Sequence, residues 1–170
     1  MDIVSEASNT DFRSYFDNKV KNSIGMDGTW NYGLIYRIYH STARSMARFG
    51  LLLLNKGEWG NEQIINENFL NECLNSSQNL NPSYGYLTWL NGKAKFMIPG
   101  SQTVFPGFLV PNAPADMYAA MGAGDQRIYV IPSKKMVVVR IGDPSVPSNP
   151  SWALSGFDNE LWGKINAVMN

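Results

Sequence analysis

The stretch Ser41-Thr-Ala-Arg-Ser-Met-Ala-Arg-Phe-Gly-Leu-Leu-Leu-Leu54 does most to decide the fold of this chain. Its apolar residues recur at helical spacing, and Ser41 is of a residue type that favours the N-cap of a helix. Asn55-Lys-Gly57 then ends the helix, because glycine readily adopts the left-handed conformation found at helix C-termini. The four leucines predict that the end of this helix is buried on more than one side.

Three other segments have helical periodicity. Residues 12–22 predict a helix with Asn9 or Thr10 as its N-cap, residues 66–74 a short helix, and residues 157–169 a closing helix.

Residues 81–142 have the shorter period of strands. Alternating and apolar runs predict strands at 84–90, 94–98, 117–121, 127–131 and 136–141. Asn91-Gly92 predicts a tight turn that joins the first two into a hairpin. The run Val137–Val139 is expected where both faces of a strand are covered. Residues 143–156 are rich in Pro and Ser and predict a loop.

The order of these elements predicts an α+β fold, an antiparallel sheet packed with helices. We expect one domain with three regions: a mainly helical region over 1–80, the strands over 81–142, and a loop and C-terminal helix over 143–170. Residues 24–30 are expected to form a turn.

The composition excludes several classes of function. Fourteen basic and fourteen acidic residues leave no net charge, and the absence of a basic run argues against binding nucleic acid. No apolar run is long enough to span a membrane. Cys73 and His40 are the only residues of their kinds, so we expect no disulfide framework, no metal site and no cofactor. The N-terminal residues do not have the pattern of a signal peptide, which leaves the cellular location open.

Three motifs together resemble the β-lactamase and penicillin-binding-protein-like serine hydrolases. They are Ser41-Thr-Ala-Arg44 with Ala47-Arg-Phe-Gly50, the stretch Pro82–Trp89, and Gly122-Ala-Gly-Asp-Gln-Arg-Ile-Tyr-Val-Ile-Pro132. The chain is most similar to the C-terminal part of the esterase and amide-hydrolase branch that includes 6-aminohexanoate-dimer hydrolase. This resemblance covers roughly residues 12–170 and implies a β-lactamase/transpeptidase-like fold.

Two motifs that this family uses for its chemistry are missing from the chain. Neither the Ser-x-x-Lys that supplies the nucleophile nor the Tyr-x-Asn that supplies a proton-shuttling tyrosine occurs in the sequence. The resemblance therefore implies an incomplete domain that lacks the N-terminal strands and the nucleophile helix. We expect such a chain to be inactive by itself.

A third family element, the Lys-Thr-Gly-like triplet on an edge strand, aligns with Ala120-Met121-Gly122. The resemblance then implies that the backbone N–H of Ala123 stabilises the oxyanion of an acyl-transfer intermediate, a role worth about 3 kcal/mol. It also implies substrate contacts from Tyr86, Trp89 and Gly124. A simple strand-to-strand turn accounts equally for the two glycines, and core packing for the two aromatic residues.

Two residues depart from the family pattern. Asp125 occupies a position where the family has glycine, which affects the geometry of the turn, and Ser45 replaces an aspartate near a helix start.

Other candidate groups are weaker. Tyr39-His40-Ser41 could substitute for Tyr-x-Asn, or His40 could form a triad with Ser41 or Asp116, but a lone histidine is more often structural. Arg44 and Arg48 are expected to pair with acidic neighbours.

Two functions follow from these observations. The first is the C-terminal portion of a serine hydrolase that cleaves a small-molecule amide or ester through an acyl-enzyme. The second is a truncated, non-catalytic paralogue that acts as a binding or assembly module. In both, apolar surface around Leu51–Leu54 and Val137–Val139 and an uncovered sheet edge predict self-association.

Overall fold

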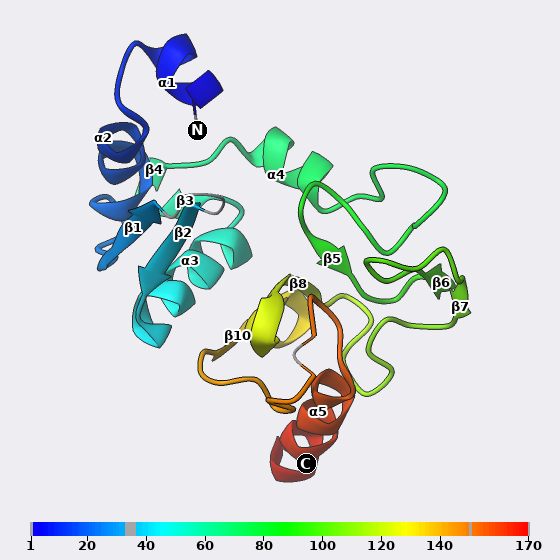
Figure 1. Cartoon of the computed structure of the whole chain (residues 1–170). Helices are drawn as coiled ribbons and strands as arrows, with labels where there is room; N and C mark the ends of the chain where they lie inside the picture. The colour runs from blue at the N-terminus through cyan, green and yellow to red at the C-terminus, as the bar shows by residue number, and fades with distance from the viewer. Residues whose placement is uncertain (1, 33–36, 150, 170) are drawn as a thin grey trace.

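The structure, a computed structural model, describes residues 2–32, 37–149 and 151–169 (Figure 1). The helices are α1 (Asp2–Ser8), α2 (Phe12–Phe16), the π-helical η1 (Asp17–Lys21), α3 (Ala43–Leu54), α4 (Glu67–Cys73), the 3₁₀ turns η2 (Ala123–Asp125) and η3 (Pro132–Lys134), and α5 (Gly156–Met169). The strands are β1 (Gly28–Tyr32), β2 (Arg37–Ser41), β3 (Glu58–Trp59), β4 (Glu62–Gln63), β5 (Trp89–Leu90), β6 (Lys95–Phe96), β7 (Phe105–Pro106), β8 (Tyr118–Gly122), β9 (Gln126–Ile131) and β10 (Met136–Arg140).

The largest sheet has four antiparallel strands in the order β10-β9-β8-β5. Its centre is a meander in which β8 and β10 each pair with β9 along their whole lengths. The other described strands form two-stranded hairpins, β1-β2, β3-β4 and β6-β7. The expected combination of antiparallel strands and helices is therefore confirmed.

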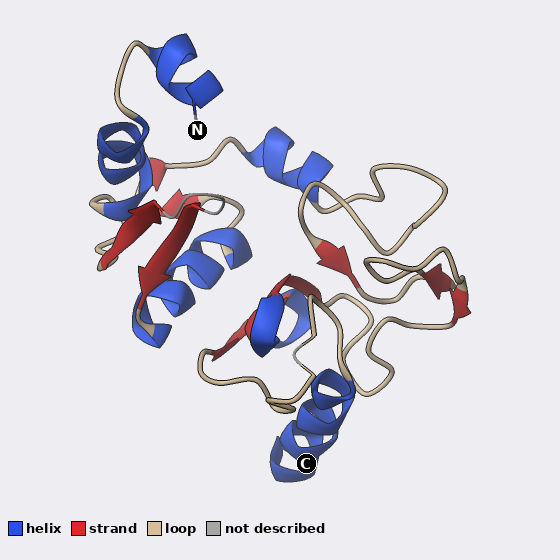
Figure 2. Cartoon of the chain, viewed as in Figure 1, coloured by secondary structure: helices blue, strands red, loops and turns tan. Residues whose placement is uncertain are grey.

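Helices cover both faces of the four-stranded sheet (Figure 2). On one face, Leu53 and Leu54 of α3 pack with alternate sheet residues, among them Val130 and Val137. On the other face, Trp162 of α5 is fully buried in a cluster with the intervening sheet residues, which include Ala119, Tyr129, Ile131 and Val138. This alternation is the two-residue period of a strand, and it confirms that β10 is covered on both sides.

The predicted helices are confirmed, but two of their N-caps are wrong. Asp11, not Asn9 or Thr10, caps α2, because its carboxylate accepts hydrogen bonds from the amides of the first turn. Thr42 caps α3 in the same way, while Ser41 is the last residue of β2.

The end of α3 is less buried than the run of leucines predicts. Leu52 is fully buried and Leu53 and Leu54 are half-buried, but Leu51 is 40% exposed. The predicted apolar surface is thus small here, and it is also small at Val137–Val139, which are half-buried between α3 and α5.

The hairpin predicted at Asn91-Gly92 is wrong. Only Trp89 and Leu90 form a strand in the first half of this segment, and they pair with β8 rather than with residues 94–98. The Asn91 side chain is buried and donates to the carbonyls of Val110, Ala113 and Pro114, while its oxygen accepts from the Val110 amide. The Asn-Gly pair thus anchors a distant loop.

The β1-β2 hairpin was not predicted, since residues 24–30 are expected to be a turn. Trp30 of β1 packs edge-on against Phe12 and Phe16, at ring distances of 5.2 and 5.4 Å, and Tyr39 of β2 packs against Phe16 at 5.1 Å. Burial of these rings stabilises the hairpin on α2. The region 1–80 therefore contains two hairpins beside its helices.

Candidate functional site

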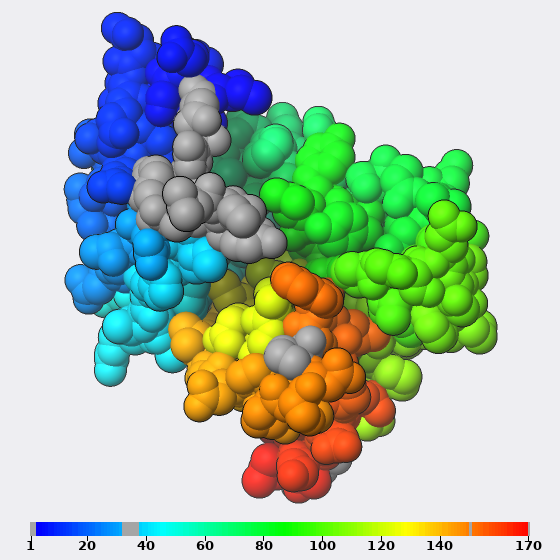
Figure 3. All heavy atoms as spheres, in the orientation of Figure 1, coloured from blue at the N-terminus to red at the C-terminus, as the bar shows by residue number. Residues whose placement is uncertain are grey.

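A pocket of about 490 Å³ lies between β2 and α3 on one side and the ends of β8 and β9 on the other. In Figure 3 the yellow β8–β9 region lies between the cyan α3 region and the green segments, which follow α3 and precede β8 in the chain. The pocket is lined by Ile38, Tyr39, His40, Ser41, Met46, Leu87, Ala120, Met121, Gly122, Gln126, Arg127, Ile128 and Ile141.

One margin of β8 is open at this pocket. The ladder between β5 and β8 covers Tyr118 and Ala119, so among the described strands residues 120–122 pair with β9 alone. The hydrogen-bond pattern shows which backbone groups face the open margin. The Asn91 amide donates to the Met117 carbonyl at 2.9 Å, and backbone groups alternate sides along a strand. Those of Met121 therefore point away from β9.

The same alternation extends to Ala123. Gly122 is extended, with φ −102° and ψ 168°, so the Ala123 N–H also points toward the open margin. The predicted triplet Ala120, Met121 and Gly122 thus lines the pocket, and Ala123 follows it at the start of η2. Gly124 lies in the turn itself, with φ 65°.

The other predicted substrate contacts lie elsewhere. Trp89 is only 6% exposed and belongs to the core on the α5 face, where its ring packs against Tyr84 at 4.7 Å. This position agrees with core packing, the alternative to a substrate contact that the sequence left open for Trp89. Tyr86 is 48% exposed and does not line the pocket, whereas its neighbour Leu87 does.

The pocket wall is mainly apolar, with side chains from four segments of the chain. Met46, Leu87, Ile128 and Ile141 contribute aliphatic surface, and His40 is an exposed titratable group beside them. Sequence reasoning did not anticipate the four aliphatic residues, since no local pattern brings segments so far apart together.

The alternative catalytic groups are not assembled for acyl transfer. Ser41 donates its hydroxyl hydrogen to the Asp27 carbonyl, and the Asp116 carboxylate accepts from the amide and hydroxyl of Ser133. His40 and Ser41 are neighbours on a strand, so their side chains point to opposite faces. Burial raises the pKa of the Tyr39 phenol, which is the wrong direction for a proton acceptor.

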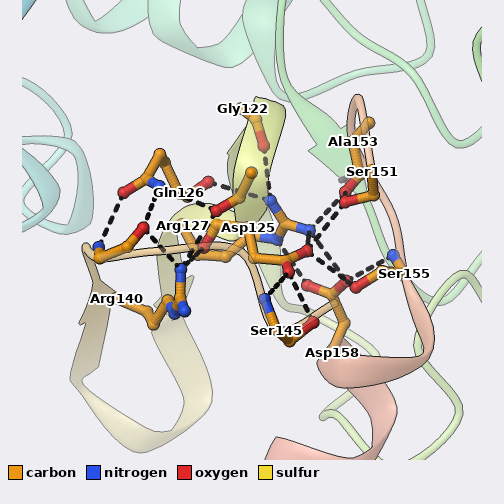
Figure 4. A network of polar contacts seen from close by, with 12 residues as sticks. Gly122, Asp125, Gln126, Arg127, Arg140, Ser145, Ser151, Ala153, Ser155 and Asp158 are labelled. Atoms are coloured by element: carbon orange, nitrogen blue, oxygen red, sulfur yellow. Dashed lines mark hydrogen bonds and ion pairs between the residues drawn. The ribbon is translucent and has the colours of Figure 1, made fainter. Parts of the chain in front are cut away.

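A buried ionic network lies directly behind the open margin (Figure 4). The Arg127 guanidinium is fully buried; its Nε lies 2.7 Å from Asp158 and its Nη2 lies 2.9 Å from Asp125. Its Nη1 donates to the Gly122 carbonyl at 2.7 Å and to the Gln126 carbonyl at 3.1 Å. A buried charge needs such pairing, because desolvation is costly.

The properties of the Asp125 side chain explain why the turn accepts aspartate at a position where glycine is expected. Its φ of 60° is left-handed, a conformation that aspartate tolerates better than most residues. The carboxylate accepts hydrogen bonds from the amide and hydroxyl of Ser145 and from the hydroxyls of Ser151 and Ser155. The departure from the family pattern therefore ties the 143–156 loop to the turn.

These contacts make the contribution of Asp125 to the stability of the fold depend on pH. Burial alone would raise the pKa of its carboxyl, but the hydrogen bonds from the three serines outweigh burial and hold the pKa well below its usual range. A lowered native pKa stabilises the fold above the unfolded value of about 3.9, and this contribution is lost as the pH falls toward the native pKa.

We expect Asp125→Asn to weaken the acid dependence of stability. The variant keeps the size of the side chain and tolerates the left-handed backbone. At neutral pH it should lower the free energy of unfolding by about 2 kcal/mol, since it replaces charge-assisted hydrogen bonds. Denaturant unfolding between pH 7 and pH 3 checks this: the difference from wild type should shrink on acidification, and a difference independent of pH would contradict the assignment.

The other departure, Ser45, joins α3 to the segment before β1. Its hydroxyl oxygen accepts from the Asp27 amide at 2.9 Å. The partner predicted for Arg48 is an acidic side chain, but its Nη1 donates to a backbone group, the Ile24 carbonyl, at 2.9 Å.

The comparisons with known proteins bear on the fold. No protein-family model and no curated protein matches this chain. Among solved structures it is similar to a putative 6-aminohexanoate-dimer hydrolase from Bacillus anthracis, with a TM-score of 0.60, 20% sequence identity, and coverage of 91% of this chain and 37% of that chain. The fold of this chain is thus related to the β-lactamase-like fold of that protein, and the chain spans about 37% of its length.

No helix among residues 2–32, 37–149 and 151–169 has the length and hydropathy for a membrane span. The same part of the chain contains no group of three or more His, Cys, Asp or Glu residues placed to hold a metal ion.

Proposed function

We propose that this chain is the C-terminal portion of a serine hydrolase that cleaves amide or ester bonds through an acyl-enzyme. In this proposal the open margin of β8, residues 120–123, forms one wall of the acyl-transfer pocket. The Ala123 N–H is the oxyanion donor, and a Ser-x-x-Lys segment outside this sequence supplies the nucleophile. The chain by itself then forms no acyl-enzyme.

The observation that carries this proposal is the open margin itself. The three residues aligned with the family triplet pair with β9 and with no other described strand, and they line a pocket of about 490 Å³. At such a margin the N–H groups of Met121 and Ala123 point away from β9, the orientation that backbone oxyanion donors require. The fold relationship to a putative 6-aminohexanoate-dimer hydrolase supports the same class of activity.

The coding region upstream and an esterase assay test the proposal together. We expect that region to read in frame into Ser-x-x-Lys and Tyr-x-Asn. The longer protein should hydrolyse p-nitrophenyl acetate, and the 170-residue chain should show no turnover above buffer. An upstream region without these motifs would refute the proposal.

That result would favour the second candidate, a non-catalytic paralogue that acts as a binding or assembly module. The mainly apolar pocket is compatible with this role. Two results together would support this role: the chain binds a ligand, and no longer protein that contains the chain hydrolyses an ester.

We also propose self-association through the edge of β10. This strand pairs with β9 on one side, and the described sheet has no strand on its other side. Unpaired edges template pairing with a second chain. Size-exclusion chromatography with light scattering should give a mass that rises with concentration, and a monomer at every concentration would contradict this prediction.

A further inference from the structure

The buried network behind β8 acts on the peptide group that the proposed function uses. The carbonyl of Gly122 and the N–H of Ala123 belong to the same planar trans peptide, so they point in opposite directions. Arg127 Nη1 lies 2.7 Å from the Gly122 oxygen, on the β9 side. Whatever fixes this carbonyl also fixes the direction of the Ala123 N–H.

The guanidinium is itself held from several sides. Its Nε contacts the Asp158 carboxylate, and its Nη2 contacts the carboxylates of Asp125 and Asp158 and the carbonyl of Ala153. The side chain is fully buried. Asp125 is in turn anchored by three serines. The guanidinium therefore has little freedom to move away from the Gly122 carbonyl.

A cation on the carbonyl also changes the peptide electronically. Hydrogen bonds with an ionised partner are stronger than neutral ones, and successive hydrogen bonds polarise one another. A positive charge at the Gly122 oxygen draws electron density from the peptide nitrogen, which makes the Ala123 N–H a better donor.

From these contacts we propose that Arg127 is a positioning residue for an oxyanion donor. Its guanidinium, which is fully buried, orients and polarises the Gly122–Ala123 peptide so that the Ala123 N–H faces the pocket. This inference rests on the proposed function, because it assumes that the open margin of β8 binds an oxyanion.

The test uses NMR on the full 170-residue chain labelled with ¹³C and ¹⁵N. Hexylphosphonate is the probe, because it combines a tetrahedral oxyanion with an aliphatic tail that suits the apolar wall. In wild type the Ala123 amide resonance should shift downfield and saturate during the titration. Absence of any response at Ala123 would overturn the proposed oxyanion margin, and with it this inference.

Arg127→Lys tests the inference separately. Lysine keeps the charge but cannot reproduce the planar fork of the guanidinium. We expect the Gly122 carbonyl ¹³C resonance to move upfield, because its contact with the guanidinium is lost. The affinity for hexylphosphonate should fall about tenfold, the effect of losing one hydrogen bond to a charged group, here the bond from the misdirected Ala123 N–H to the oxyanion. A variant that is merely less stable, with an unchanged Gly122 resonance and unchanged affinity, would overturn the positioning role and leave the proposed function intact.

Two further variants keep the test decisive. Arg140→Lys is the matched control, because Arg140 contacts the carbonyls of Gly124 and Asp125 in the same turn but not that of Gly122. It should change the affinity less than twofold, and a tenfold loss would show that any disturbance of the turn suffices. If Arg127→Lys does not fold, Asp125→Asn replaces it; we expect the same two changes in smaller size, and their absence would contradict the inference.

Discussion

Asp158→Ala should lower the free energy of unfolding by about 3–5 kcal/mol, the usual cost of breaking a buried ion pair. Asp158 is fully buried and accepts hydrogen bonds from Arg127, from the Tyr129 hydroxyl at 2.6 Å and from the Ser155 amide at 2.8 Å. Without this carboxylate, Arg127 keeps only one of its two ion-pair partners, Asp125, and the Tyr129 hydroxyl loses its acceptor. Denaturant unfolding at pH 7 measures the loss.

Glu160→Ala is the matched control for this change. Glu160 lies on the same helix, α5, but its side chain is exposed. Exposed positions of this kind usually change stability by less than about 0.5 kcal/mol. Equal losses for the two variants would mean that the network contributes nothing specific to the fold.

Gly50→Val should lower the free energy of unfolding by about 3 kcal/mol, because α3 lies directly against the sheet at this glycine. A Cβ atom at Gly50 would lie 2.5 Å from Val137 Cγ1 and 3.0 Å from Ile128 Cγ2, and the branched neighbours cannot move aside cheaply. The helix must therefore shift away from β9 and β10. The gain in helix propensity offsets only a few tenths of a kcal/mol.

Gly156→Val provides the control, since a Cβ atom at Gly156, the first residue of α5, meets no atom within 4 Å. We expect its stability to lie within about 0.5 kcal/mol of wild type. Thermal and denaturant unfolding of both variants give the comparison. If Gly50→Val is as stable as Gly156→Val, then the close approach of α3 to the sheet is wrong.

The sequence predicted the parts of the fold that have a local signal. Apolar residues at helical spacing indicated α3 and α5, and the two-residue period indicated β8, β9 and β10, because each pattern reflects burial of one face of the element itself. The β1-β2 hairpin was missed, since its rings pack against α2, an element earlier in the chain, as well as against each other, and neither contact leaves a local pattern. Asn91-Gly92 misled for the same reason: its hydrogen bonds go to a loop about twenty residues away.

The candidate site could be predicted only in part. The triplet at residues 120–122 came from the resemblance, and the structure brings it to a pocket. The Arg127 network was not predicted, because its partners stand as far as 31 positions away in the sequence and no spacing rule connects them. A run of serines between prolines over 143–156 predicted a loop, but it gave no sign that three hydroxyls converge on one carboxylate.

We propose that this chain provides a wall of an acyl-transfer pocket but not the attacking group. Labelling with a fluorophosphonate, followed by intact mass spectrometry, shows whether an activated serine is present. Serine nucleophiles that are activated for acyl transfer react with this reagent, whereas the Ser41 hydroxyl already donates to the Asp27 carbonyl. We predict no adduct on the 170-residue chain, and one adduct per chain, on Ser41 or any other serine, would contradict the account.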